Sequence, residues 1–491
     1  MNLYYYSNSY LSTREIFFLT NLRILSYTRD VFCTKQPQSN GVKTQIGHLI
    51  MSEKTYEVPC IYNNLSNNSL VTARVPGSKS ITNRALLLAT LAEGRSTLHG
   101  VLFSDDSRHF LKCIQDLGFD TAVNEEAKTI TVYGHGGEAP RRDVSLYVGS
   151  AGTAARFLTA YLGVSHGVYH MDASEQMRKR PMAPLLNSLV ELGCDVIYPK
   201  TSDVTQEGHF PFTLHSNGFG KSAISIDIGH SSQFLSALLI SACLSDDDFT
   251  IRIDGTHGMT YIEMTRRMME QFGVIAQQTA PDTFVIKKGQ TYKALDYQIE
   301  PDVSAACYFY AMSPLLHVPV MVHNVHFDSL QGDVEFIRIL EQMGCSATDT
   351  PEGILVNPPQ SRNYHGITVD MSSCSDQAIT LAVIAPFADT PTTITGIGHI
   401  RFQESNRIRA IVTELTKMGI QCDETDSSVT IYPGTPKPSV VETYDDHRMA
   451  MGFSLIGLRS EGIVISDPDC CRKTFENYFD VLTDIIRTIQ K

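Results

Sequence analysis

A recurring unit, repeated along most of the chain, constrains the fold more than any other feature of the sequence. Five apolar, helix-like runs end at a glycine, and strand-like runs such as residues 129–133 and 428–432 often follow. A glycine just past a helix commonly adopts the left-handed conformation that ends the helix, so we predict five helix C-termini. By residue number the five glycines lie 75, 80, 71 and 75 residues apart. They are Gly118, Gly193, Gly273, Gly344 and Gly419.

A second set of positions follows the same period. Six times a strand-like segment leads into a short polar loop and then into an apolar helix, at intervals of 72, 77, 72, 72 and 71 residues. The unit is longer than most solenoid repeats, so we predict that each one is a small α/β fold with several strands. Six units can divide into two domains of three, with helix N-termini converging on a cationic cleft. The equivalent positions are Arg84, Arg156, Gln233, Ala305, Gln377 and Arg448.

Composition limits the classes of partner. Of the 491 residues 42% are hydrophobic and 19% are charged, which suits large cores and at least two domains. A formal net charge of −13 argues against a nucleic-acid partner. No uninterrupted apolar run has the length of a membrane span, so we expect no membrane partner. The 11 cysteines lack metal-site spacing, and reduced thiols in a cytoplasm are the simplest interpretation.

Residues 1–50 differ from the rest of the chain. They hold two acids, Glu15 and Asp30, against five lysines or arginines. Three interpretations stay open: a start assigned too far upstream of Met51, a targeting segment, or a disordered extension. We favour the first, because the segment lacks the apolar region and cleavage site of a signal peptide.

The loop at residues 76–84 joins a strand-like run at residues 70–75 to an apolar helix. Unpaired N–H groups and the helix dipole attract anions to such a place. Lys79 and Arg84 add charge, and Ser80 adds a hydroxyl. The loop is not a nucleotide-binding P-loop, because the glycine and lysine spacing of that motif is absent. An ordinary capped helix with surface cations stays open as the alternative.

Three later segments have similar chemistry. Residues 149–156 place Gly152, which lets a ligand approach the backbone, one turn before Arg156. Arg180 precedes a proline, which holds it out of the helical region. Ser231 and Ser232 open an apolar helix, where they can act as caps or hold a phosphate. For each segment a structural turn, a solvated charge run or a simple cap is the alternative.

Acidic residues mark two further loops. Asp376 stands at the start of an apolar helix, where it can be a cap or a general base. Glu404 and Arg407 are three residues apart on a presumed helix, so they either pair on the surface or act on a proton and an anion. Residues 446–451 and Lys473 complete the set. Many cations, hydroxyls and two acids, without a metal cage or nucleotide fingerprint, fit two small anionic substrates and acid–base chemistry without a cofactor.

Taken together, these motifs resemble the 5-enolpyruvylshikimate-3-phosphate synthase family. The resemblance runs from about residue 56 to residue 491, with all motifs in the family's order. It is carried by residues 77–84, 151–156, 180–181, 231–233, 401–407, 446–451 and 473–475.

The resemblance implies a two-domain enolpyruvyl transferase fold, an inside-out α/β barrel of six βαβαββ-type repeats with three per domain. Domain I would combine residues 51–75 with 301–491, and domain II would be residues 76–300, inserted. The implied reaction transfers the enolpyruvyl group of phosphoenolpyruvate to the 5-hydroxyl of shikimate 3-phosphate, on the pathway to chorismate and aromatic amino acids. It passes through a tetrahedral intermediate and releases phosphate, without cofactor or metal. We also expect a cytoplasmic monomer, and competition by glyphosate with phosphoenolpyruvate.

The resemblance also assigns roles to residues. Asp376 would take the proton of the attacking hydroxyl, while Glu404 and Lys79 would protonate the methylene carbon and manage the leaving phosphate. The residues implied for phosphoenolpyruvate are Lys79, Gly152, Arg180, Gln233, Arg407, Arg448 and Lys473. Those implied for shikimate 3-phosphate are Lys79, Ser80, Arg84, Ser231, Ser232, Gln233, Tyr261, Asp376, His399 and Gln403.

Three positions depart from the commonest family pattern. Gln403 stands where a lysine is frequent, His399 where an asparagine is common, and Gly258 where a serine often contacts the phosphate. These departures bear on how shikimate 3-phosphate is held. Two alternatives stay open: the related enolpyruvyl transferase acting on UDP-N-acetylglucosamine, and a non-catalytic anion-binding repeat protein. The former typically carries a cysteine on a mobile loop, and no cysteine here has that context.

Overall fold

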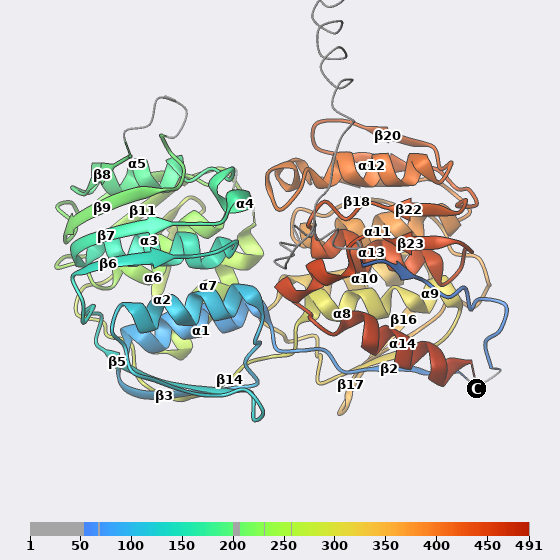
Figure 1. Cartoon of the computed structure of the whole chain (residues 1–491), viewed down its shortest axis with the longest axis horizontal. Coiled ribbons are helices and arrows are strands. Elements are labelled where there is room, and N and C mark those ends of the chain that lie inside the picture. Colours follow the sequence, from blue (N-terminus) through green and yellow to red (C-terminus); the bar gives the residue numbers. More distant parts are fainter. Residues whose placement is uncertain (1–53, 67–68, 200–206, 230, 257, 491) are drawn as a thin grey trace, which may run out of the picture. The chain divides into compact units, whose positions relative to one another are not determined.

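The computed structural model describes residues 54–66, 69–199, 207–229, 231–256 and 258–490 (Figure 1). The interpretations of residues 1–50 therefore lie outside the described residues. Each repeat unit is built around a sheet with a parallel pair of strands. Five of these sheets add an antiparallel pair and the sixth adds one antiparallel strand. A parallel pair needs a helical crossover, whereas antiparallel neighbours can be joined by a short turn. The prediction of α/β units with several strands is confirmed.

Three units are continuous in the sequence. In each, the first strand lies at one edge of the sheet and the third strand at the other. The first contains β6 (Asp143–Tyr147), α3 (Gly152–Val164), β7 (His166–Asp172), α4 (Glu175–Arg178), α5 (Ala183–Glu191), β8 (Asp195–Ile197) and β9 (Phe212–Asn217). The second contains β10 (Ala223–Asp227), α6 (Gln233–Ala242), β11 (Phe249–Asp254), α7 (Met259–Gln271), β12 (Ala276–Ala280) and β13 (Thr283–Ile286). The third contains β18 (Thr368–Asp370), η3 (Ser375–Gln377), α11 (Ala378–Ile384), η4 (Ala385–Phe387), β19 (Thr392–Thr395), η5 (Gly398–Phe402), α12 (Arg407–Lys417), β20 (Cys422–Glu424) and β21 (Val429–Ile431).

The other three units each take one strand from a distant part of the chain. One contains α1 (Lys79–Leu91), β3 (Glu93–His99), α2 (Asp105–Asp116), β4 (Thr121–Asn124), β5 (Thr129–His135) and the distant β14 (Asp296–Gln298). Another contains α8 (Val303–Tyr310), α9 (Met312–Leu316), β15 (Val320–His323), η2 (Gly332–Val334), α10 (Glu335–Gln342), β16 (Ser346–Thr350), β17 (Gly353–Asn357) and the distant β2 (Val71–Ala73). The last contains β22 (Ser439–Val441), α13 (His447–Gly457), β23 (Ile463–Ile465), η6 (Pro468–Lys473), α14 (Tyr478–Ile489) and the distant β1 (Tyr56–Glu57).

The strand that leads into the first polar loop therefore belongs to a different unit from the helix that follows it. The strand predicted at residues 70–75 is present as β2, but it pairs in parallel with β15. The parallel partner of β3, the strand after α1, is β14 instead. Two extended segments cross between the units side by side, where Ser78 N donates to Glu300 O and Asp302 N donates to Pro76 O, each at 2.8 Å.

The five glycines of the repeat end helices as predicted. All five have φ between +81° and +106°, in the left-handed region that a side chain disfavours. Gly344, for example, follows Met343, the C-cap of α10, and its N–H donates to Glu341 O at 2.9 Å. These turns direct the chain from each helix into the following antiparallel strands.

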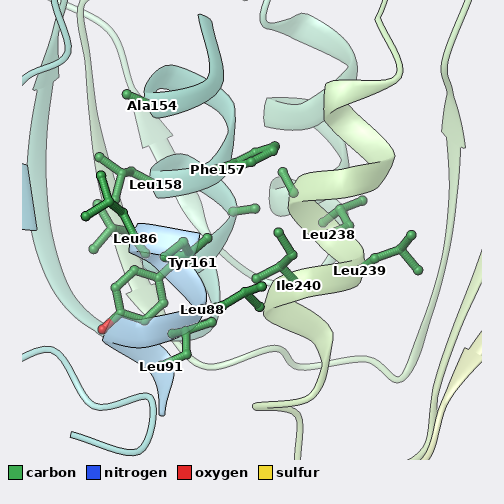
Figure 2. Close-up of a cluster of buried hydrophobic side chains, with 14 of the residues drawn as sticks. Leu86, Leu88, Leu91, Ala154, Phe157, Leu158, Tyr161, Leu238, Leu239 and Ile240 are labelled. Carbon is green, nitrogen blue, oxygen red and sulfur yellow. The ribbon is translucent and has the colours of Figure 1, made fainter. Parts of the chain in front are cut away.

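Two hydrophobic cores are present, and each is centred on three helices. In the first, α1, α3 and α6 bury Leu86, Phe157, Leu238 and their neighbours against one another (Figure 2). In the second core, the three central helices are α8, α11 and α13. These helices read as apolar around their whole circumference because sheets and other helices surround them. The domain limits predicted at residues 76 and 300 stay a prediction.

Among the described residues, no helix combines the length and apolar character needed to cross a membrane. Within the same part of the chain, no group of three or more His, Cys, Asp or Glu side chains is arranged to hold a metal ion.

Candidate active site

The polar loops at the N-terminal ends of the central helices line a cavity of about 100 Å³. Residues associated with both cores contribute to its wall. The helix dipoles point their positive ends toward it, which favours anions. Six cations and three carboxylates are among its lining side chains. The cations are Lys79, Arg84, Arg156, Arg180, Arg407 and Arg448, and the carboxylates are Asp106, Asp376 and Glu404.

The first loop contributes Lys79, Ser80 and Arg84 from the first two turns of α1. The Lys79 ammonium lies 3.4 Å from Asp106 Oδ2, and the Asp106 side chain is buried. Arg84 is also buried, and its Nε donates to Thr265 Oγ1 at 2.8 Å. Burial lowers the pKa of Arg84 to about 10, so the guanidinium stays charged near neutral pH. Sequence analysis correctly placed these two cations and the serine hydroxyl together, but it missed Asp106.

Gly152 brings the backbone close to two arginines. A Cβ at this position would lie 2.8 Å from an Nη atom of Arg156 and 3.0 Å from one of Arg180. No larger residue fits without moving these guanidinium groups. Arg180 also approaches Glu404, with 3.5 Å between Nη1 and Oε1. The loop before α3 is thus built around a cluster of positive charge, as its sequence indicates.

The helix starts at α6 and α7 supply hydroxyl and amide groups. Ser231, Ser232 and Gln233 all line the cavity, and Gln233 Oε1 is buried with no hydrogen-bond partner among the described residues. The Tyr261 hydroxyl donates to Asp376 Oδ2 at 3.0 Å. Gly258 caps α7 with φ of +66°, and a Cβ there would lie 2.5 Å from Ser232 Oγ. The glycine at this position, one of the departures from the family pattern, is therefore required by the local backbone.

Asp376 lies between two arginines. Its Oδ1 is 3.1 Å from Arg407 Nη1 and its Oδ2 is 2.8 Å from Arg448 Nη2. Burial acts to raise the pKa of Asp376, but the charges of Arg448 and Arg407 outweigh burial and lower the pKa to about 2. In this arrangement Asp376 is an ionised, partly buried carboxylate that lines the cavity.

Glu404 is held in the same way, but not on a helix. It lies in the turn between η5 and α12, because Asn406 caps α12 by accepting from Arg409 N at 3.2 Å. The expectation that Glu404 and Arg407 share a helix is therefore wrong. The alternative of a surface pair is also wrong, since the Arg407 side chain is buried and the Glu404 side chain, 2.9 Å away, is only 11% exposed. Burial acts to raise the pKa of Glu404, yet Lys473, Arg180 and Arg407 hold it well below its usual value.

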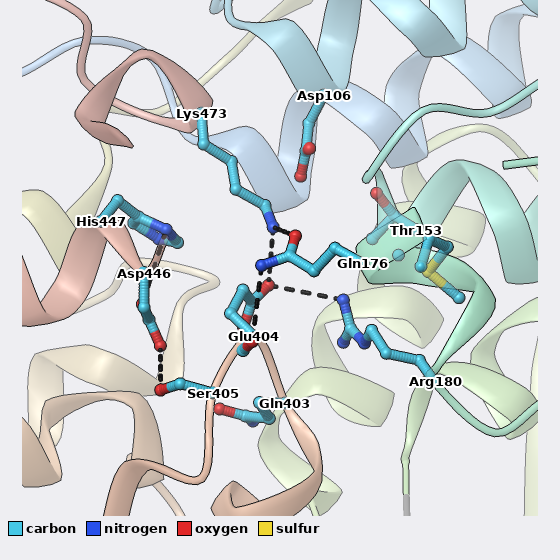
Figure 3. A network of polar contacts seen from close by, with 12 residues as sticks. Asp106, Thr153, Gln176, Arg180, Gln403, Glu404, Ser405, Asp446, His447 and Lys473 are labelled. Carbon is cyan, nitrogen blue, oxygen red and sulfur yellow. Dashed lines mark hydrogen bonds and ion pairs between the residues drawn. The ribbon is translucent and has the colours of Figure 1, made fainter. Parts of the chain in front are cut away.

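Lys473 comes from η6 and reaches the cavity through Glu404. Its Nζ lies 3.4 Å from Glu404 Oε1 and 3.3 Å from Gln176 Oε1 (Figure 3). Of two other predicted site residues, one lines the cavity and the other does not. Gln403 lines the cavity and accepts a hydrogen bond from Arg407, whereas His399 is absent from the lining and contacts Ser375 Oγ at 2.8 Å.

Other residues of this region carried no role in the sequence analysis. Asp446 Oδ2 accepts from Arg407 Nε at 2.8 Å, and His447 lines the cavity. Burial and the charges of Lys79 and Arg448 lower the pKa of His447 well below its usual value, so the imidazole is neutral. The motif at residues 446–451 pointed to this pair. Asp106 had no comparable signal, because an acid at a helix start usually acts as a cap.

Comparisons with known proteins agree with this architecture. Residues 68–482 match the sequence model of EPSP synthase, described as 3-phosphoshikimate 1-carboxyvinyltransferase. The protein of that name from Nostoc punctiforme is 42% identical, over 87% of this chain and 97% of the relative. The chloroplastic protein of that name from Arabidopsis thaliana is 40% identical, over 84% of this chain and 82% of the relative.

Solved structures show the same fold. The EPSP synthase of Acinetobacter baumannii aligns with a TM-score of 0.71 at 23% identity, covering 88% of this chain and 98% of that one. The enolpyruvyl transferase NikO of Streptomyces tendae aligns with a TM-score of 0.66 at 17% identity, covering 87% and 96%. The fold implied by the family resemblance, a two-domain enolpyruvyl transferase fold of six βαβαββ-type units, is confirmed. The chain belongs to the EPSP synthase family.

Proposed function

We propose that the protein transfers the enolpyruvyl group of phosphoenolpyruvate to the 5-hydroxyl of shikimate 3-phosphate. The observation that carries this proposal is the pair of partly buried, ionised acids, Asp376 and Glu404, inside a cavity walled by six cationic side chains. Phosphate and carboxylate groups are costly to desolvate unless cations and hydrogen-bond donors replace water. The relatives named above as 3-phosphoshikimate 1-carboxyvinyltransferase support the same reaction.

Phosphoenolpyruvate is assigned to the strongly cationic side of the cavity. Arg407 and Arg448 flank Asp376, and Arg180 and Lys473 flank Glu404. These four cations suit the carboxylate and phosphate of one small substrate, because an arginine can donate two parallel hydrogen bonds to either group. Lys79, the amide edge at Gly152 and the side chain of Gln233 complete this set.

Shikimate 3-phosphate is assigned to the side formed by the starts of α1, α6 and α7. Its phosphate is matched by the serine hydroxyls and helix N-termini, and Arg84 supplies a nearby charge. The Tyr261 hydroxyl lies 3.0 Å from Asp376 Oδ2, which supports the assignment of Asp376 as the base beside the ring that carries the 5-hydroxyl. The proposed set is Lys79, Ser80, Arg84, Ser231, Ser232, Gln233, Tyr261, Asp376 and Gln403. His399 contributes indirectly, through its contact with Ser375.

In the addition step, the 5-hydroxyl oxygen forms a bond to C2 of phosphoenolpyruvate while its proton passes to Asp376. The methylene carbon C3 takes a proton from the Lys79 ammonium, or from Glu404 after this carboxylate, which is ionised in the structure, has itself gained a proton, giving a tetrahedral intermediate. In the elimination step, C3 returns a proton, the C2–O bond to phosphate breaks, and the enolpyruvyl ether and inorganic phosphate leave. Preformed cations stabilise the negative charge that grows on the departing phosphate.

A carboxylate with a pKa of about 2 is a weak base, so the arginines beside Asp376 matter to the chemistry. When the anions of phosphoenolpyruvate occupy Arg407 and Arg448, those cations no longer act on Asp376 alone. The affinity of Asp376 for a proton then rises toward that of a useful general base. Substrate binding thereby activates the base at the moment when it is needed.

The alternatives have less support. The related enzyme acting on UDP-N-acetylglucosamine typically uses a cysteine over phosphoenolpyruvate, and the described residues that line the cavity include no cysteine. A non-catalytic anion-binding protein does not require two partly buried acids among the cations. We further propose a monomer without cofactor or metal in the cytoplasm, where free cysteines such as Cys307 stay reduced. The two domains are proposed as residues 51–75 with 301–491, and residues 76–300.

The deciding experiment measures phosphate release from phosphoenolpyruvate by the purified full-length chain. Shikimate 3-phosphate and UDP-N-acetylglucosamine are supplied in separate reactions. Release with the former alone is the expected result. Release with UDP-N-acetylglucosamine alone would replace the proposal by the sister activity, and release with neither would leave a binding protein.

A further inference from the structure

Gln176 is an uncharged side chain that joins three parts of the cationic half of the cavity. It lies on the short helix α4, whose place is fixed by the buried Met177 and by Ser174, which caps the helix. Met177 belongs to the first hydrophobic core, whereas every group that the Gln176 amide contacts belongs to elements of the second. Figure 3 shows the side chain reaching toward Glu404 and Lys473, beside Arg180.

The Gln176 amide uses both of its polar atoms. Nε2 donates to Glu404 O and to Asp445 O, each at 3.4 Å, and Oε1 accepts from Lys473 Nζ at 3.3 Å. The opposite orientation of the amide would place its oxygen against two carbonyl oxygens and its NH₂ group against an ammonium. Only one orientation therefore satisfies all three neighbours.

One of these contacts holds a strained turn. Tyr444 and Asp445 have φ of 57° and 52°, so two consecutive residues with side chains adopt the left-handed conformation. Each costs free energy and persists only where the surroundings enforce it. The turn leads directly into Asp446 and Arg448, and Asp446 pairs with Arg407 at 2.8 Å. The hydrogen bond from Gln176 to Asp445 O thus supports the turn that delivers the phosphoenolpyruvate arginines.

An amide side chain suits position 176 better than a charged side chain would. A carboxylate would compete with Glu404 for Lys473 and would repel an anionic substrate. A cation would repel Lys473 and Arg180. We propose that Gln176 is a positioning residue, which sets Glu404, Lys473 and the turn at residues 444–446 in the geometry that phosphoenolpyruvate requires. The inference rests on the proposed function and extends it to a residue outside the cavity lining.

The test compares Gln176→Met, which keeps the length of the side chain but removes its hydrogen bonds, with Lys179→Ala. Lys179 is the matched control, because it follows the same helix but pairs with Glu175 on the surface. In the full-length protein we expect Gln176→Met to lower kcat/KM for phosphoenolpyruvate about tenfold or more. The KM for shikimate 3-phosphate, its Kd measured alone by calorimetry, and the melting temperature should stay near wild type. Lys179→Ala should change none of these quantities.

A second variant separates positioning from packing. Gln176→Glu keeps an oxygen for Lys473 but loses both donors and adds charge, so its kcat/KM for phosphoenolpyruvate should fall below that of Gln176→Met. The inference is overturned if Gln176→Met stays within twofold of wild type. It is equally overturned if Gln176→Met lowers kcat/KM for both substrates by the same factor and also lowers the melting temperature. If the wild-type chain itself is inactive, the proposed function is overturned. If the wild type is active and Gln176→Met is unaffected, only the role of Gln176 is overturned.

Discussion

Asp376 is the residue whose replacement distinguishes chemistry from binding. Asn has the same shape and can still accept from Tyr261, but it cannot take a proton. We expect Asp376→Asn to lower kcat by a factor of about 10² to 10⁴, the usual contribution of a general base. Calorimetric binding of shikimate 3-phosphate should persist, because the serines and Arg84 are unchanged. Turnover at the wild-type rate would remove Asp376 from the role of base.

Asp333, whose pKa is affected by the charge of Asp376, makes the stability of the protein depend on pH. It is buried, accepts from Ser304 Oγ at 2.6 Å, and has a pKa raised to about 6 by burial and by the charge of Asp376. A pKa above the unfolded value means that the folded protein binds the proton more tightly. Stability from this group is complete below the unfolded pKa near 4 and is lost as the pH rises through about 6.

Asp333→Asn removes this penalty, because the amide stays neutral at every pH. Relative to wild type, the variant should gain on the order of 2 kcal/mol in unfolding free energy between pH 4.5 and 7.5. Urea denaturation of both proteins at the two pH values measures the gain. Because Asp376 is present in both proteins, its own titration does not account for the difference. A difference between variant and wild type that does not change with pH would contradict the raised pKa.

At the scale of the elements, the glycine ends of the helices allow a direct test. Gly344 has φ of +106°, and an added Cβ would meet only Pro359, at an ordinary contact distance of 3.4 Å. Gly344→Ala should therefore cost about 1 kcal/mol through backbone strain alone, with kcat and KM unchanged. Gly220→Ala is the matched control, because its φ lies outside the left-handed region and its nearest neighbour is also at 3.4 Å. Equal stability changes in both variants would show that conformation is not the cause.

The predictable parts of the fold were those encoded locally. Polar loops before apolar helices and glycines after helices repeat within short windows, so the units, Asp376 and most of the cations could be found. The position of Glu404 was predicted wrongly because Asn406, a favourable cap, was overlooked as the start of α12. Asp106, Gln176 and the pairing of β2 with β15 depend on contacts between distant segments, which local patterns do not encode.

At the scale of the whole molecule, the cavity is small for its proposed ligands. Its volume of about 100 Å³ lies below the roughly 300–1,000 Å³ of usual ligand pockets. Entry of two substrates therefore requires the parts of its wall to separate, and the bound anions then draw the cations of both cores together. We expect small-angle scattering to show a smaller radius of gyration with both substrates than without them. An unchanged radius in both conditions would argue against such closure.

The sheet pairings impose an order on how the molecule is made. The strands of the first core's sheets lie between residues 93 and 298. A ribosome has therefore synthesised all of them before it reaches α8, the first helix of the second core. β1 and β2 emerge earliest, yet their partners are β23 and β15. These amino-terminal strands must stay unpaired while the first core forms and most of the chain is translated. Because contacts of such long range form last, the edges of these two strands stay open to pairing with other strands during this interval.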